Sequence, residues 1–201
     1  MTLLAVVKTM KCLTSITFLN IYTNNSQNRL EYGYNRFMKV LFIGGIKSGK
    51  SFNAEKFILE MSDKKPIYLA TTEFIDDEMQ IRIEEHKVQR ADSFISEEEP
   101  LHIYETILKQ ERNVLVECLS MWINNMMYHK YSYEDMRSEL AKIMSLKSSV
   151  VFVLNDVGSG IIPTNKLARE FIDISGKLSQ FVAEECDEVY HTIAGISTRI
   201  K

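Results

Sequence analysis

Proline, glycine and cysteine are all scarce in this chain of 201 residues, which contains 3 Pro, 8 Gly and 3 Cys. A chain with so few of them has no Pro-rich or Gly-rich linker of the kind that separates domains. The cysteines, Cys12, Cys118 and Cys186, are odd in number and far apart, so they predict neither a metal-binding pair nor a disulfide framework. This usage is typical of a reduced, cytoplasmic protein. We expect Cys118 and Cys186 to be buried thiols, because apolar stretches surround them.

A basic surface and a membrane-spanning run are also missing. The formal net charge is −3, so no broad positive field would attract nucleic acid. Lys8 and Lys11 interrupt the apolar pieces near the start, which leaves no signal-peptide core and no run long enough to span a membrane. A composition of 45% hydrophobic and 25% charged residues is that of a globular chain with one sizeable core.

The first 37 residues differ from the rest of the chain. Their apolar pieces give way to a polar stretch over residues 23–36, and Met38 then opens an apolar strand directly. We therefore predict that residues 1–37 are a poorly ordered N-terminal extension, upstream of a functional start at Met38. Residues 38–201 would form a single nucleotide-binding catalytic domain. The alternative for the extension is a short targeting or docking helix.

The most informative segment is the octapeptide at residues 44–51, which matches the P-loop pattern G-x-x-x-x-G-K-S. An apolar strand at 40–43 precedes it and a helical run at 52–61 follows, which is the context that the motif needs. Lys50 would reach the β- and γ-phosphates of a nucleotide, and Ser51 would give an oxygen to Mg²⁺. A chance Gly-Lys-Ser in a plain turn is disfavoured by this context. The predicted nucleotide contacts in this loop are Gly44, Gly45, Ile46, Lys47, Ser48, Gly49, Lys50 and Ser51.

Continuous β-branched runs alternate with amphipathic helices after the P-loop. This pattern predicts an α/β, P-loop NTPase-like fold, in which helices cover both faces of a mostly parallel sheet. The expected strands are 40–43, 66–70, 113–117, 149–154 and 189–194, and the last of them closes the sheet. The expected helices are 52–61, 75–90, segments between 118 and 146, and a long helix from Pro163 to Glu185. Because ligands bind beyond the carboxyl ends of such strands, we expect chemistry in the turns that follow them.

Two groups of residues could carry chemistry at that edge. Glu117 ends an apolar strand, as the acid that holds Mg²⁺ does in P-loop enzymes, although it could be a solvated strand end. Arg82, His86 and Arg90 are spaced i, i+4, i+8 and form one stripe on the helix at 75–90. Two guanidiniums suit an anionic ligand and would keep the imidazole neutral and nucleophilic. The alternative is a salt-bridged, solvated helix face, with Glu78 pairing with Arg82.

Weaker signals occur further along the chain. The acid run at residues 96–100 precedes a probable helix, and taken alone it is best interpreted as a solvated N-terminal turn. The polar and glycine-containing loop at 155–160 could close on a substrate or be a plain turn. His102, His129 and His191 show no metal-ligand spacing, so we interpret them as structural or exposed.

Taken together, these segments resemble the bifunctional adenosylcobinamide kinase/adenosylcobinamide-phosphate guanylyltransferase family of cobalamin assembly. The resemblance runs in order from about Met38 to Lys201. It is carried by the P-loop, Tyr68 to Thr72, Asp76 to Met79, Arg82-Ile83, His86, Glu98 to Pro100, Glu117 to Leu119, Trp122, Asn124-Asn125, Asn155 to Gly158, Gly160 to Pro163, Leu167 to Arg169, Asp173, Gly176 and Gly195-Ile196.

The resemblance implies two reactions and two nucleotides. One reaction transfers the γ-phosphoryl group of ATP or GTP to a hydroxyl of adenosylcobinamide. The other transfers GMP from GTP to the resulting phosphate through a covalent GMP-histidine, and gives adenosylcobinamide-GDP. It also implies Mg²⁺ as cofactor, a corrinoid substrate and a homotrimer. His86 matches the family's catalytic histidine. The nucleotide contacts that the resemblance adds to the P-loop are Thr71, Thr72, Glu73, Lys87, Val88, Gln89, Arg90, Glu98 and Glu117. Arg82 is predicted to contact the nucleotide from its place in the stripe.

Two rival interpretations remain open at this point. A simple P-loop kinase of another small metabolite would transfer a γ-phosphoryl group and form no covalent nucleotide. A nucleotide-switched binding module would bind nucleotide without turning over a corrinoid.

Overall fold

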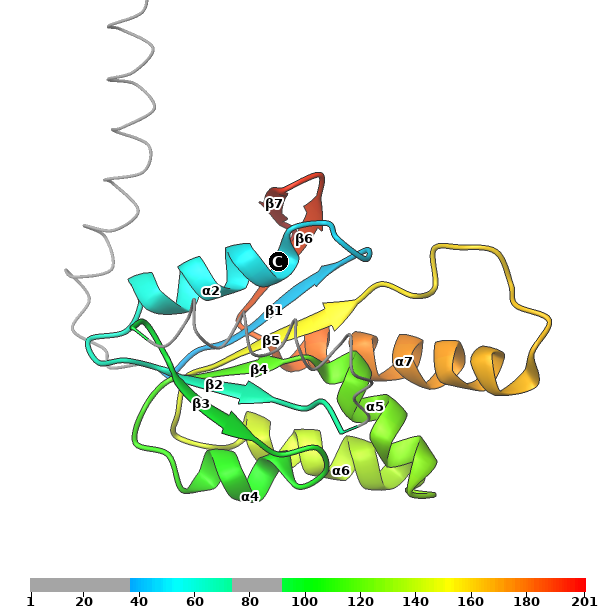
Figure 1. The fold of residues 1–201 in the computed structure, drawn as a ribbon, viewed down its shortest axis with the longest axis horizontal. Helices are drawn as coiled ribbons and strands as arrows, with labels where there is room; N and C mark the ends of the chain where they lie inside the picture. The colour runs from blue at the N-terminus through cyan, green and yellow to red at the C-terminus, as the bar shows by residue number, and fades with distance from the viewer. Residues whose placement is uncertain (1–36, 74–91) are drawn as a thin grey trace, which may run out of the picture. The chain divides into compact units, whose positions relative to one another are not determined.

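Within residues 37–73 and 92–201, which the computed structural model describes, seven strands form one sheet (Figure 1). Their spatial order is β3-β2-β4-β5-β1-β6-β7. The strands are β1 (Lys39–Gly44), β2 (Ile67–Ala70), β3 (Ile95–Glu98), β4 (Val114–Glu117), β5 (Val150–Asn155), β6 (Glu188–Ile193) and β7 (Ile196–Arg199). All neighbours pair in parallel except β6 and β7, which are antiparallel. The predicted α/β fold with a mostly parallel sheet is confirmed.

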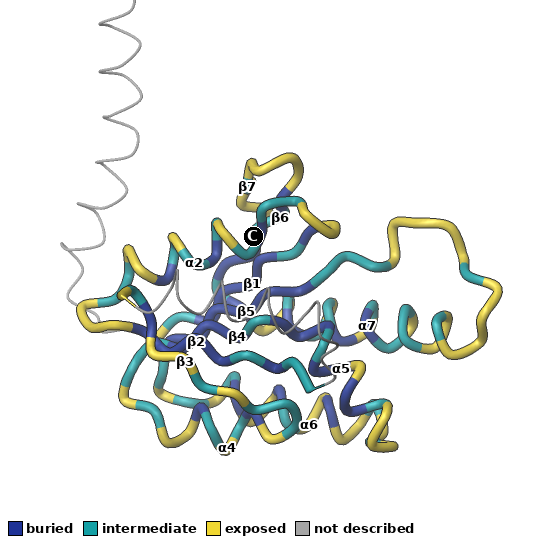
Figure 2. The backbone as a smooth tube through the Cα atoms, in the orientation of Figure 1, coloured by how far each residue is buried: buried dark blue, intermediate teal, exposed yellow. Residues whose placement is uncertain are grey.

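Helices cover both faces of this sheet, because the side chains of each central strand alternate between two apolar clusters. Val40 and Phe42 of β1 belong to the cluster that includes Ala54 and Ile58. Leu41 belongs to a larger cluster on the other face. The helices are α2 (Lys50–Glu60), α4 (Ile103–Leu108), α5 (Leu119–Tyr128), α6 (Tyr133–Met144) and α7 (Lys166–Glu185). Helix α2 packs on the first face, and the other four pack on the second. Figure 2 shows how the central strands are buried between these layers.

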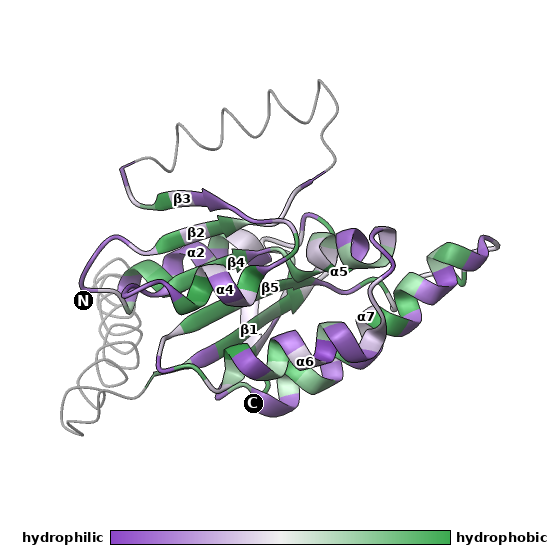
Figure 3. Ribbon diagram, turned by 90° about the horizontal axis from the view of Figure 1, so that it is seen from below, coloured by the Kyte–Doolittle hydropathy of each residue, from purple (hydrophilic) through white to green (hydrophobic). Residues whose placement is uncertain are grey.

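Figure 3 shows apolar residues along the central strands, and apolar residues alternating with polar ones along the helices. Trp122 of α5 is the largest fully buried side chain, and its ring N–H donates to the carbonyl of Leu101 at 2.8 Å. This hydrogen bond lets an indole be buried without leaving its donor unpaired. None of the described helices is both long and apolar enough to cross a membrane.

The structure corrects three details of the predicted secondary structure. The acid run is not the first turn of a helix: residues up to Glu98 form edge strand β3, which pairs with β2, and α4 begins only at Ile103. An edge strand tolerates charged side chains because one side of its backbone faces solvent. The long helix begins at Lys166 rather than at Pro163, because Asn165 caps it by accepting a hydrogen bond from the backbone N–H of Ala168.

The third correction concerns the end of the sheet, which β6 does not close. The chain turns at Ala194 and Gly195, both with positive φ (50° and 82°), and returns as β7. Two consecutive positive φ values are the signature of a tight hairpin turn that matches strand twist. We call residues 188–199 the C-terminal hairpin.

Candidate active site

The parallel register brings the carboxyl ends of the strands to one edge of the sheet. Gly44 of β1 lies opposite Asn155 of β5 and Thr192 of β6, and Ala70 of β2 lies opposite Glu98 and Glu117. Residues that are far apart in sequence therefore meet where an open α/β sheet binds its ligands.

The P-loop leaves β1 at this edge and leads into α2. Lys47 and Gly49 have positive φ (56° and 91°), and the carbonyl of Gly45 accepts from the N–H of Ser48 at 3.2 Å. A side chain at Gly44 would not fit, because a Cβ atom there would lie 2.4 Å from the carbonyl oxygen of Thr192. Helix α2 begins at Lys50, so its positive end faces the loop. The motif thus has the backbone conformation of an anion-binding turn.

Lys50 supplies a cation inside this turn. Its side chain is largely buried, and its ammonium donates to the carbonyl of Gly45 at 3.3 Å. A buried ammonium that donates to one carbonyl has further N–H groups to donate to phosphate oxygens.

Ser51 and Glu117 meet beside the loop. The hydroxyl of Ser51 donates to Oε1 of Glu117 at 2.8 Å, which joins the start of α2 to the end of β4. An alcohol and a carboxylate oxygen are the hard ligands that Mg²⁺ prefers, and P-loop enzymes complete its shell with phosphate oxygens and water. The described residues contain no cluster of three or more His, Cys, Asp and Glu side chains suited to a metal. The pair therefore fits a Mg²⁺ ion that a bound nucleotide would bring with it.

The segment after β2, residues 71–73, is clamped from several sides. Thr71 is fully buried, its hydroxyl donates to the carbonyl of Cys118 at 2.8 Å, and it accepts from the N–H of Cys118 at 3.1 Å. The amide of buried Asn125 donates to the carbonyls of Thr71 and Pro100, at 2.6 and 3.1 Å. In this structure the Thr71 side chain therefore supports the segment. Of the three predicted nucleotide contacts in residues 71–73, only Thr72 and Glu73 are solvent-accessible.

Glu73 has a partner that sequence reasoning did not assign. Its Oε1 lies 2.7 Å from Nε2 of His129, at the C-terminal end of α5. Both side chains are partly exposed. His129 was interpreted as structural or exposed, and no spacing in the sequence links it to a residue 56 positions earlier.

The three glutamates of the acid run, Glu97, Glu98 and Glu99, have different surroundings. Glu97 accepts from the side-chain amide of Gln110, and Glu99 accepts from the N–H groups of Leu101 and His102. These two carboxylates therefore stabilise local structure. Glu98 ends β3 at the ligand edge and is exposed. Its contact with a nucleotide stays a prediction.

The predicted catalytic stripe lies outside the described residues. Residues 74–91 are not described, and they include the predicted site residues Arg82, His86, Lys87, Val88, Gln89 and Arg90. They follow the clamped segment at 71–73 directly in the chain. Their roles remain predictions.

Cys118 lies next to Glu117 but is not a reactive thiol. Burial, together with the neighbouring carboxylate, raises the pKa of Cys118 to about 11, and outweighs the backbone hydrogen bonds at the start of α5 that lower it. Burial likewise raises the pKa of Cys186 to about 12. Both cysteines are buried, as predicted.

Both thiols should resist alkylation in the folded protein. At pH 8 a thiol with a pKa near 11 is only about 0.1% thiolate, which is the reactive form. We expect iodoacetamide to leave Cys118 and Cys186 unmodified at pH 8, as read by peptide mass spectrometry, while both react fully in denaturant. Alkylation of Cys118 in the folded protein as fast as in the unfolded chain would contradict its burial.

Comparison with known proteins adds the following similarities. Residues 40–200 match the family described as cobinamide kinase / cobinamide phosphate guanyltransferase. The bifunctional adenosylcobalamin biosynthesis protein CobU of Escherichia coli is 34% identical over 183 residues, covering 82% of this chain and 100% of that protein. The bifunctional adenosylcobalamin biosynthesis protein CobP of Pseudomonas aeruginosa is 34% identical over 170 residues, covering 82% and 98%. Among solved structures, the flagellar accessory protein FlaH from Methanocaldococcus jannaschii has 10% identity and a TM-score of 0.46, over 87% of this chain and 81% of that one.

Proposed function

The chain belongs to the cobinamide kinase / cobinamide phosphate guanyltransferase family, and from that premise we propose how its own residues carry out the two reactions. It is a bifunctional enzyme of adenosylcobalamin biosynthesis, with cobinamide kinase and cobinamide phosphate guanylyltransferase activities. The rival interpretations, a kinase of another metabolite and a binding module, account for neither the second activity nor the match over residues 40–200.

The observation that carries the proposal is the meeting of three elements at one sheet edge. The P-loop, the Ser51–Glu117 pair and the clamped segment at 71–73 lie at the carboxyl ends of β1, β4 and β2, on one edge of the sheet. A triphosphate held by the P-loop would thus lie near the start of the segment that contains His86. Mg²⁺, held by Ser51 and Glu117 with phosphate oxygens, would supply a positive charge that offsets the charge on the phosphates.

In the guanylyl half-reaction, a neutral imidazole nitrogen of His86 attacks the α-phosphorus of GTP. A P–N bond forms, the bridging bond from the α-phosphorus to oxygen breaks, and pyrophosphate leaves in the P-loop. Arg82 and Arg90 stabilise the charge on the α-phosphate oxygens. An oxygen of the cobinamide phosphate then attacks the same phosphorus, the P–N bond breaks, and adenosylcobinamide-GDP is released.

In the kinase reaction, the aminopropanol hydroxyl of adenosylcobinamide attacks the γ-phosphorus of ATP or GTP and its proton is released. The bond from the γ-phosphorus to the bridging oxygen breaks, and ADP or GDP leaves. Lys50 and Ser51 hold the β- and γ-phosphates in line for this transfer, so positioning and charge neutralisation supply most of the acceleration. Thr72, Glu73, Lys87, Val88, Gln89 and Glu98 complete the nucleotide contacts. The enzyme would act in the cytoplasm, as a homotrimer, with residues 1–37 outside the catalytic domain.

The test is to follow the label of two GTP preparations. We expect GTP labelled at the α-phosphorus to leave radioactivity on the denatured protein, which is stable in alkali and lost in acid, as a phosphoramidate is. GTP labelled at the γ-phosphorus should leave none, and should instead label adenosylcobinamide when that substrate is added. Absence of protein-bound α-label under conditions in which adenosylcobinamide-GDP forms would rule out the covalent route.

A further inference from the structure

The C-terminal hairpin touches the P-loop at the tip of its turn. The N–H of Gly195 donates to the carbonyl of Ser48 at 2.7 Å, across 147 positions of sequence. The two backbones approach so closely that a Cβ atom at Gly49 would lie 2.9 Å from the Cα of Gly195. Gly195-Ile196 is one of the matches that carry the family resemblance, but neither reaction described above uses it.

Asn53 joins the same two segments from the first turns of α2. Its side-chain amide donates to the carbonyl of Gly49 and to the carbonyl of Gly195, both at 3.0 Å. The carbonyl of Gly49 also accepts from the backbone N–H of Asn53 at 3.1 Å. One side chain thus holds the end of the P-loop and the hairpin turn together.

These contacts determine which way two peptide groups of the P-loop point. In a planar trans peptide the carbonyl of one residue and the N–H of the next point in opposite directions. With the Ser48 carbonyl turned to the hairpin, the N–H of Gly49 points to the opposite side. With the Gly49 carbonyl held by Asn53, the N–H of Lys50 points away from the helix. These are the donors that a P-loop offers to a β-phosphate.

We propose that Asn53 and the Ala194–Gly195 turn are positioning residues that hold the P-loop in its phosphate-binding conformation. Asn53 acts through the backbone, by fixing the carbonyls of Gly49 and Gly195. The proposal rests only on triphosphate binding at the P-loop, so it is independent of His86 and of the covalent step. Because coupling between two sites is reciprocal, a bound triphosphate should in turn stabilise the hairpin turn.

The first test uses the unaltered protein and amide hydrogen exchange. We expect the α,β-methylene analogue of GTP, in which neither transfer to His86 nor loss of pyrophosphate can occur, to slow exchange of the amides at residues 194–199 about tenfold or more at saturation. Unchanged exchange in the hairpin, with slowed exchange in the P-loop, would overturn the proposal. No cobinamide is present and the bond between the α- and β-phosphates cannot be cleaved, so the result does not depend on the proposed guanylyl transfer.

The second test changes the side chain. Two hydrogen bonds of ordinary net strength predict that Asn53→Ala weakens binding of the same analogue about tenfold, measured by calorimetry. Asn53→Asp keeps the shape but places a carboxylate, which cannot donate, against two carbonyl oxygens, so it should bind more weakly than the alanine variant. The nucleotide KM of both reactions should rise in parallel with these losses.

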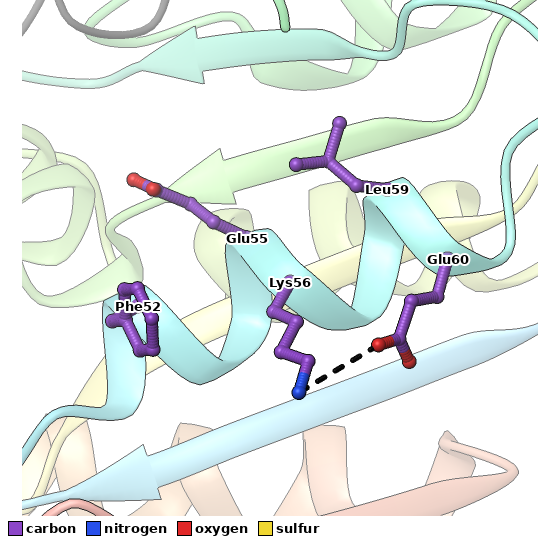
Figure 4. Close-up of a pocket in the computed structure, with 5 residues that line it drawn as sticks. All are labelled: Phe52, Glu55, Lys56, Leu59 and Glu60. Carbon is purple, nitrogen blue, oxygen red and sulfur yellow. Dashed lines mark ion pairs between the residues drawn. The ribbon is translucent and has the colours of Figure 1, made fainter.

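Lys56→Ala is the matched control, because Lys56 lies on the outer side of the same helix (Figure 4). There it makes an exposed ion pair with Glu60 at 3.8 Å, beside the surface depression that Phe52, Glu55 and Leu59 also line. This variant should bind the analogue like the unaltered protein. Wild-type affinity in both Asn53 variants would overturn the proposal. If either variant fails to fold, the exchange experiment on the unaltered protein decides.

Discussion

Replacing His86 by alanine is expected to abolish guanylyl transfer while the kinase reaction continues. The proposed mechanism makes this imidazole the nucleophile, so its loss removes the covalent route rather than weakening it. Removing a catalytic nucleophile costs at least about 10³-fold in kcat. With α-labelled GTP the variant should carry no protein-bound label. Incubation with adenosylcobinamide and ATP should yield adenosylcobinamide phosphate, which chromatography separates from the GDP-linked product.

His102→Ala provides the control for this experiment. His102 is exposed at the N-terminal cap of α4, where its side chain makes no capping hydrogen bond. Its loss should leave both activities and the covalent label intact. Retention of acid-labile label in His86→Ala would remove His86 from the mechanism and direct the search to another histidine. Loss of the kinase reaction as well would assign His86 to the structure of the nucleotide site.

Lys50→Met is expected to abolish both reactions together, in contrast to the His86 variant. The Lys50 ammonium lies inside the P-loop, where it donates to the carbonyl of Gly45, and both proposed reactions place a triphosphate there. Methionine keeps the unbranched shape of the buried stem and removes the charge. Loss of one preorganised charge contact at a phosphoryl group costs about 10²- to 10³-fold in kcat/KM. Steady-state rates of both reactions, measured on the same preparation, would show the parallel loss.

Lys56→Met is the control, because it removes a lysine charge from the exposed side of the same helix. Both rates should stay close to those of the unaltered enzyme. A Lys50→Met enzyme that still phosphorylates adenosylcobinamide at the normal rate would show that the phosphates bind elsewhere. Thermal unfolding of the variant checks that the loss comes from the site and not from the fold.

The strand and helix assignments near the P-loop could be made from sequence because local patterns are strong there. The apolar run before Gly44 is buried on both faces of the sheet and therefore lacks alternation, as parallel strands do. The P-loop follows a strand and precedes a helix, which is the context that gives the motif its meaning.

The elements that sequence reasoning missed are those whose stability comes from pairing rather than from local pattern. Strand β3 is short, acidic and exposed, and it exists because β2 offers an edge to it. Strand β7 likewise depends on the hairpin turn at Ala194, where positive φ falls on a residue that seldom adopts it. The expected helix start at Pro163 was wrong because the cap at Asn165, two residues further on, decides where helical hydrogen bonding begins.

The sequence alone was enough to identify the family, the P-loop and the two reactions, because the motif, its flanking strand and helix, and the ordered family matches can all be identified from the order of the residues. Only the tertiary structure decided which of these side chains support the site and which can reach a ligand. It placed the Thr71 hydroxyl inside the protein, brought Ser51 to Glu117, and set Gly195 and Asn53 against the loop. Such contacts depend on strand register and on close backbone approach, and neither property leaves a periodic trace in sequence.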